Sequence, residues 1–309
     1  MRHNLCRRVA CVLLAVSLLL SFCALCAGAE DAPSDTDKPV FLLMGDSIPD
    51  AYGIDNRDEA SYGRIVADTN GYVYRNIGRT ATDSAELVDL IENYALWDKE
   101  RNGWRNVTDY IAEADIICLS IGANDYFDQD DETVKLLVGA LFGVNKKEMD
   151  AIAAQYYTNL CRIIELIREN NPDTEILVQT LYSVWYGLAG NANRACAKRV
   201  NGMIEKYDRE HPDTIHICDI SPAMNRKPQN LANDCAHPNA NGNVAIAEVV
   251  LQKLYDLGLG TETTPVVHVA GTDWNYFTTY YGESKGKFFA AVVMIATGNG
   301  VNVFRLFKE

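Results

Sequence analysis

Residues 39–47 read Pro-Val-Phe-Leu-Leu-Met-Gly-Asp-Ser, and this stretch decides the fold. The unbroken apolar run from Val40 to Met44 is typical of a strand buried on both faces, because a strand with one wet face alternates apolar and polar side chains. Gly45, Asp46 and Ser47 supply turn residues directly after the run. The stretch therefore predicts a central strand of a covered sheet that ends in a polar turn.

Further short apolar runs follow, and helical patterns separate them. A stripe of apolar residues from Ile152 to Ile167 indicates one helix, and residues Asn239 to Leu257 indicate the last. Strands that alternate with helices form parallel sheets, so we expect a three-layer α/β/α sandwich around five parallel strands. Besides the first run, the strand candidates are Tyr72–Asn76, Ile116–Ile121, Ile176–Val178 and Ile215–Cys218.

Residues 1–29 have the features of a signal peptide. Three arginines precede an apolar run from Val9 to Leu25, and Ala27-Gly28-Ala29 offers a small-residue cleavage site. The apolar run is shorter than the roughly 20 residues that a membrane-spanning helix needs. We therefore expect a secreted or extracytoplasmic protein with no stable membrane span after cleavage.

The composition of the remaining chain limits its partners. Removal of residues 1–29 leaves 25 Lys and Arg against 42 Asp and Glu, a formal charge of −17. Such acidity argues against nucleic acid or an anionic membrane as the main ligand. The five cysteines that remain are dispersed, which favours buried thiols over disulfides.

The chain divides into segments of different character. Residues 30–38 are polar and form a linker, residues 39–260 form the expected α/β domain, and residues 261–309 form an appendage. The appendage is rich in Thr, Tyr, Val and Gly. Because turn residues 298–300 separate the apolar runs 288–296 and 301–307, we expect a β-rich segment with a β-hairpin.

Polar residues cluster where the strands end. Parallel sheets bind ligands beyond the carboxyl ends of their strands. Ser47 follows the first strand, Gly78 the second and Asn124 the third, while Asp234 and His237 directly precede the last helix. We expect all of these residues at one edge of the sheet.

These residues supply the parts of a nucleophilic site. A serine hydroxyl attacks a carbonyl well only when a base takes its proton, and a carboxylate orients that base. Ser47, His237 and Asp234 fit the three roles in that order. The oxyanion that forms needs hydrogen-bond donors, and the candidates are the backbone N–H groups of Ser47 and Gly78 and the side-chain amide of Asn124.

The ordered set of motifs resembles the SGNH hydrolase superfamily, also called GDSL esterases and lipases, over Pro39 to Leu259. Ile48 stands where the family name has Leu, and the second block is reduced to the glycine of Asn76-Ile77-Gly78. The resemblance implies the flavodoxin-like SGNH fold, with Ser47 as nucleophile, Gly78 and Asn124 in the oxyanion hole, and Asp234 with His237 completing the triad.

The resemblance also implies the activity. It predicts hydrolysis of carboxylic esters through an acyl-serine intermediate, with no metal and no organic cofactor. The substrate is a small-molecule, lipid or polysaccharide ester. A carbohydrate acetyl esterase and a lipase, lysophospholipase or thioesterase both fit the motifs, and the alternative from another class is a non-catalytic surface or carbohydrate-binding protein. Trp185 and Tyr186, after the fourth strand, are candidate sugar or acyl contacts.

Overall fold

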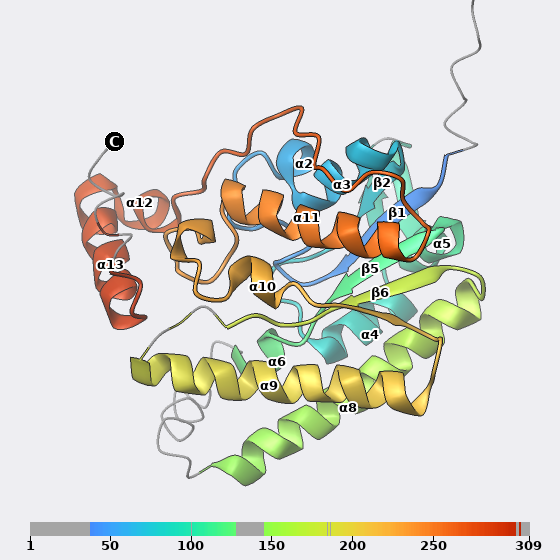
Figure 1. Cartoon of the computed structure of the whole chain (residues 1–309), viewed down its shortest axis with the longest axis horizontal. Helices are drawn as coiled ribbons and strands as arrows, with labels where there is room; N and C mark the ends of the chain where they lie inside the picture. Colours follow the sequence, from blue (N-terminus) through green and yellow to red (C-terminus); the bar gives the residue numbers. More distant parts are fainter. Residues whose placement is uncertain are drawn as a thin grey trace, which may run out of the picture. The chain divides into compact units, whose positions relative to one another are not determined.

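Five parallel strands form the central sheet, in the order β2-β1-β5-β6-β7 (Figure 1). Each overlaps one of the runs expected from the sequence, so the predicted five-stranded parallel sheet is confirmed. The strands are β1 (Val40–Gly45), β2 (Val73–Asn76), β5 (Ile116–Ser120), β6 (Glu175–Gln179) and β7 (His216–Cys218).

The computed structural model describes residues 38–99, 101–127, 145–183, 185, 187–300 and 303. The expected signal peptide and nearly all of the linker lie outside the described residues. All elements named below belong to the unit Pro39–Glu309.

Helices cover both faces of the sheet, as the unbroken apolar runs predicted. In β1, Leu42 and Met44 face one core while Phe41 and Leu43 face the other, and all four are fully buried. Figure 1 shows the two helical layers. The first core is closed by α4 (Ser84–Asn93), α5 (Val107–Glu113), α8 (Lys146–Asn170) and α9 (Gly187–Glu210), and the second by α3 (Tyr62–Asn70), α10 (Ser221–Met224) and α11 (Ala240–Asp256).

A small antiparallel hairpin between α4 and α5 was not predicted. Its strands, β3 (Ala95–Asp98) and β4 (Gly103–Asn106), have four residues each. Trp97 and Trp104 face each other across it, with ring centroids 5.8 Å apart. Runs this short carry little periodicity, so cross-strand pairs of this kind are visible only in the structure. The remaining short elements are α2 (Arg57–Ala60), α6 (Asn124–Phe127) and η2 (Pro228–Asn230).

The C-terminal segment is helical, so the predicted β-hairpin is wrong. It contains α12 (Tyr276–Tyr281) and α13 (Glu283–Ala296), and the only strand-like pairing recorded in its described part is the single bridge from Asp273 to Ile54. The buried residues of α13 are Gly286, Ala290 and Met294, which recur every four residues and form one helical stripe. Most of the expected second strand, residues 301–307, lies outside the described residues.

Gly286 explains how α12 and α13 pack. A Cβ placed there would lie 2.5 Å from the Cα of Thr278, so only glycine lets the two helices approach this closely. Nine apolar residues look equally suited to a strand or a helix, so the run by itself does not distinguish the two. Within the described residues, no helix is long and apolar enough to span a membrane.

The five cysteines after residue 29 are all free thiols, as their dispersal predicted. Four are buried and Cys161 is partly exposed. Burial raises the pKa of Cys196 and Cys218 to about 12, so these thiols stay protonated at neutral pH.

Candidate active site

A sharp turn after β1 places Ser47. Gly45 has a φ of +127°, and a Cβ there would lie 1.8 Å from the carbonyl oxygen of Ser120 in β5, so only glycine fits. The backbone N–H of Asp46 donates to that carbonyl at 3.0 Å, and the Asp46 carboxyl accepts from the N–H of Ile48 at 2.9 Å. These bonds fix the backbone on both sides of Ser47.

The turn before α11 positions His237 and Asp234. One oxygen of Asp234 accepts the backbone N–H groups of Ala236 and His237 at 2.9 and 3.0 Å, and the other lies 2.7 Å from Nδ1 of His237. Asn239 then caps α11 by accepting the N–H of Gly242. One carboxylate therefore holds both the turn and the imidazole ring.

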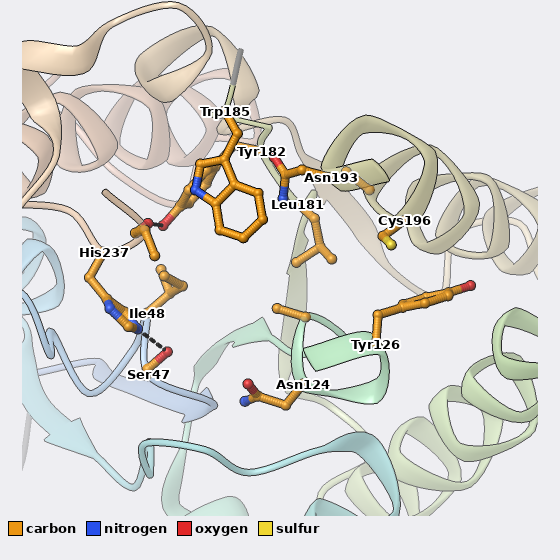
Figure 2. A pocket seen from close by; sticks show the side chains of 13 residues that line it. Ser47, Ile48, Asn124, Tyr126, Leu181, Tyr182, Trp185, Asn193, Cys196 and His237 are labelled. Atoms are coloured by element: carbon orange, nitrogen blue, oxygen red, sulfur yellow. Dashed lines mark hydrogen bonds between the residues drawn. The ribbon is translucent and has the colours of Figure 1, made fainter. Parts of the chain in front are cut away.

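Ser47, His237 and Asp234 meet in one hydrogen-bonded line. Nε2 of His237 lies 2.8 Å from Oγ of Ser47, across 190 positions of sequence (Figure 2). Because the Asp234 carboxylate can only accept, Nδ1 carries the ring proton and Nε2 is the acceptor for the serine hydroxyl. The structure thus brings together the three side chains that the sequence singled out.

Buried charges set the ionisation of this line. Burial by itself would lower the pKa of His237, but the adjacent Asp234 carboxylate outweighs it and the pKa is raised above its ordinary value. Burial likewise opposes ionisation of Asp234, yet His237 and two backbone N–H groups lower its pKa. The pair therefore favours a carboxylate beside an imidazole that readily accepts a proton.

Asn124, the first residue of α6, lies beside Ser47 in the same pocket. Its side-chain nitrogen donates to the carbonyl of Thr82 at 2.8 Å, which orients the amide and leaves its second N–H for a ligand. The backbone N–H of Ser47 donates no hydrogen bond within the described part of the chain. Two of the three expected oxyanion donors are therefore close together.

Gly78 is placed differently from the expectation. Its backbone N–H donates to the side-chain oxygen of Asn76 at 2.8 Å, and Gly78 does not line the pocket that holds Ser47. The Asn76 side chain closes a local turn that already satisfies this donor. In the same loop Ala81 has a φ of +69°, a left-handed backbone that the alanine in the sequence did not signal.

A cavity of about 310 Å³ opens beside Ser47. Trp185, one of the expected contacts, lines it, whereas Tyr186 lies outside the described residues. Two residues of the cavity wall form hydrogen bonds with the turn that contains His237. The Tyr182 hydroxyl donates to the carbonyl of Ala236 at 2.8 Å, and the Trp185 indole N–H donates to the carbonyl of Cys235 at 2.9 Å. The cavity wall and the His237 turn are thus built as one unit.

The C-terminal segment also reaches this region, which the sequence did not reveal. The N–H of Asp55 donates to the carbonyl of Thr272 at 2.8 Å, and the N–H of Trp274 to that of Gly53 at 3.0 Å. The Asn56 side chain completes the attachment by pairing with the backbone of Ala270 and Thr272. Residues 270–275 therefore hold the loop that follows Ser47.

The sandwich and the Ser-His-Asp line at the carboxyl edge of its sheet are those of the α/β ester hydrolases. The chain belongs to the GDSL-like Lipase/Acylhydrolase family, whose model matches residues 43–245. This confirms the resemblance to SGNH hydrolases and supports an esterase or lipase type of hydrolase. No curated protein matches the chain.

Two solved structures illustrate the likeness. The lipase Lip_vut3 from a goat rumen metagenome is 16% identical, with 72% of this chain and 98% of that chain covered and a TM-score of 0.51. An active-site mutant of a family two carbohydrate esterase from Clostridium thermocellum is 15% identical, with 72% and 64% covered and a TM-score of 0.50. At these identities the likeness shows the fold alone.

Proposed function

We propose that the protein hydrolyses carboxylic esters through an acyl-serine intermediate. The observation that supports this most strongly is the line of hydrogen bonds from Asp234 through His237 to Ser47. Oγ of Ser47 attacks the ester carbonyl while Nε2 of His237 takes its proton. The amide of Asn124 and the N–H of Ser47 stabilise the oxyanion.

The same imidazole completes both halves of the reaction. When the tetrahedral intermediate collapses, the carbon–oxygen bond to the alcohol breaks and His237 gives its proton to the departing oxygen. A water molecule then attacks the acyl-serine, His237 takes one of its protons, and Ser47 regains a hydrogen as the carboxylic acid leaves. Asp234 keeps the ring oriented and stabilises each imidazolium that forms.

We place this activity outside the cytoplasm. The arginines, apolar run and small-residue site of residues 1–29 support export. The strong negative charge of the remaining chain supports a neutral or weakly charged ester as substrate, rather than nucleic acid. N-terminal sequencing of the exported protein is expected to begin at Glu30, and a retained Met1 contradicts the cleavage.

A fluorophosphonate probe and a short-chain p-nitrophenyl ester test the chemistry. The wild-type protein is expected to be labelled on Ser47 and to hydrolyse the ester, and Ser47→Ala is expected to lose both. Ser284→Ala is the matched control, because that serine is exposed on α13. Labelling that persists in Ser47→Ala contradicts the nucleophile. A wild-type protein that is neither labelled nor active supports the non-catalytic alternative.

A further inference from the structure

The wall of the cavity beside Ser47 is mainly apolar. The polar side chains at the cavity are those of Ser47, His237, Asn124 and Asn193. The hydroxyl of Tyr182 and the indole N–H of Trp185 are occupied by backbone carbonyls, so these residues line the cavity with ring faces. The other lining residues are Ile48, Ala123, Tyr126, Leu181, Cys196, Ala197 and Ala236.

The direction of the cavity shows which half of an ester it receives. His237 must protonate the departing alcohol, so the alcohol leaves on the imidazole side of Ser47. Figure 2 shows Ser47 and His237 at one side of the pocket, with Tyr126 and Cys196 across from them beyond Asn124. The cavity therefore reaches from His237 past Asn124, and its part beyond Asn124 lies away from the leaving group, along the path of the acyl group.

The far part of the cavity is lined by tightly packed side chains. Tyr126 and Cys196 are each 1% exposed, and the Tyr126 hydroxyl donates to the carbonyl of Met149 at 2.8 Å. A tightly packed apolar wall at this part of the cavity fits an apolar chain that ends there better than a polar glycan. This favours the acyl chain over a glycan as the occupant.

The volume sets the length of that chain. At roughly 30 Å³ for each water-sized group, the cavity of about 310 Å³ has space for about ten non-hydrogen atoms. An acetyl group would leave most of the apolar wall in contact with water. We propose, on the basis of the acyl-serine chemistry above, that the cavity binds an unbranched apolar acyl chain of about six to eight carbons, which makes medium-chain esters the preferred substrate class.

A series of p-nitrophenyl esters from acetyl to palmitoyl tests this on the full-length exported protein. We expect kcat/KM to rise about fourfold for each added methylene up to hexanoyl or octanoyl, the ratio that corresponds to about 0.8 kcal/mol per buried CH₂. We expect it to fall for palmitoyl, whose chain exceeds the cavity. A maximum at acetyl, or a rate that keeps rising to palmitoyl, overturns the assignment.

A cavity-filling substitution tests the effect of the cavity wall on acyl-chain preference without changing Ser47, His237 or Asp234. Cys196→Phe adds five non-hydrogen atoms at the far part of the cavity, roughly half of its volume at 30 Å³ each. We expect the ratio of octanoyl to acetyl kcat/KM to fall at least tenfold relative to the wild type. Cys161→Phe is the matched control, because that thiol on α8 does not line the cavity. An unchanged ratio in folded Cys196→Phe overturns the assignment.

The two proposals fail in different ways. Hydrolysis with an acetyl optimum, together with probe labelling of Ser47, leaves the acyl-serine chemistry standing and rejects the medium-chain assignment. Absence of both hydrolysis and labelling across the series rejects the chemistry itself, and the assignment with it. If Cys196→Phe does not fold, the wild-type series alone still decides the chain length.

Discussion

Tyr52 and Trp274 lie edge to face, with ring centroids 4.5 Å apart and an interplanar angle of 86°. On its other side Tyr52 contacts the imidazole of His237, because the two ring centroids lie 4.8 Å apart. The Arg57 guanidinium packs over both aromatic rings. Trp274 comes after residue 245, where the family match ends. The Tyr52 ring therefore connects the C-terminal segment to His237.

Trp274→Ala is expected to lower kcat about tenfold without unfolding the sandwich. Loss of the indole frees Tyr52, which in turn leaves His237 less well oriented and more exposed to water. Since burial lowers the pKa of His237, added water should raise that pKa and move the acid limb of the kcat/KM profile to higher pH. Steady-state kinetics from pH 5 to 9 measure both effects.

Two controls accompany this variant. Trp274→Phe keeps an aromatic edge against Tyr52 and should retain most of the activity. Trp104→Ala removes an indole that is 72% exposed on β4, and should leave both kcat and the pH profile unchanged. If Trp274→Ala is folded and its acid limb matches the wild type, Trp274 has no part in positioning the base.

The hydrogen-bonded line of Ser47, His237 and Asp234 could be predicted from the sequence because each of its residues occupies a fixed place in the topology. Ser47 directly follows an apolar strand, and His237 directly precedes α11, the last helix of the sandwich, so a parallel sheet brings both to one edge. The spacing of three between Asp234 and His237 suits a turn that bonds carboxylate to imidazole, which is the geometry observed.

The remaining features depend on contacts that leave no local pattern. Gly78 looked free to donate, but the side chain of Asn76 occupies its N–H. The apolar run of α13 fits a strand or a helix equally well, and its packing against α12 at Gly286 is not visible in the run itself. Tyr52 and Trp274 are ordinary aromatic residues until the fold brings them to His237.

Activity is expected to fall on acidification as His237 becomes protonated. Because the pKa of His237 is raised, the midpoint should lie above the ordinary value of about 6.5. Asp234→Asn removes the charge that raises this pKa and also permits the wrong ring tautomer, so we expect kcat to fall about 10³- to 10⁴-fold. A pH series of kcat/KM on both proteins checks this, and comparable rates for the two would exclude Asp234 as the orienting group.

Asn124→Ala is expected to lower kcat about 10²- to 10³-fold with little change in KM, because the amide acts mainly on the charge of the transition state. The loss corresponds to about 2.7 to 4 kcal/mol of transition-state stabilisation. Gly78→Ala is not a neutral comparison, since a Cβ there would lie 2.7 Å from the backbone nitrogen of Asp50. Asn193→Ala, at the same cavity, is the better control. A rise in KM with kcat unchanged would place Asn124 in substrate binding alone.

Asp46→Asn is expected to make the protein more stable at alkaline pH. Burial raises the pKa of Asp46 from 3.8 to about 7, and one of its oxygens has no hydrogen-bond partner within the described residues. Between about pH 4 and 7 the folded state holds this proton while the unfolded state releases it, so the wild type loses stability as the pH rises through that window. Three pKa units set an upper limit of about 4 kcal/mol.

Asparagine is neutral throughout, and its amide oxygen can still accept the N–H of Ile48 that Asp46 accepts at 2.9 Å. We therefore expect urea unfolding at pH 5 and pH 8 to show that the free energy of unfolding of Asp46→Asn rises relative to that of the wild type as the pH increases. Asp173→Asn, at an exposed position after α8, should show no such gain. The free energies of unfolding of Asp46→Asn and the wild type could instead differ by the same amount at both pH values. In that case the buried carboxyl does not titrate in this window, and ionisation of Asp46 does not limit stability at neutral pH.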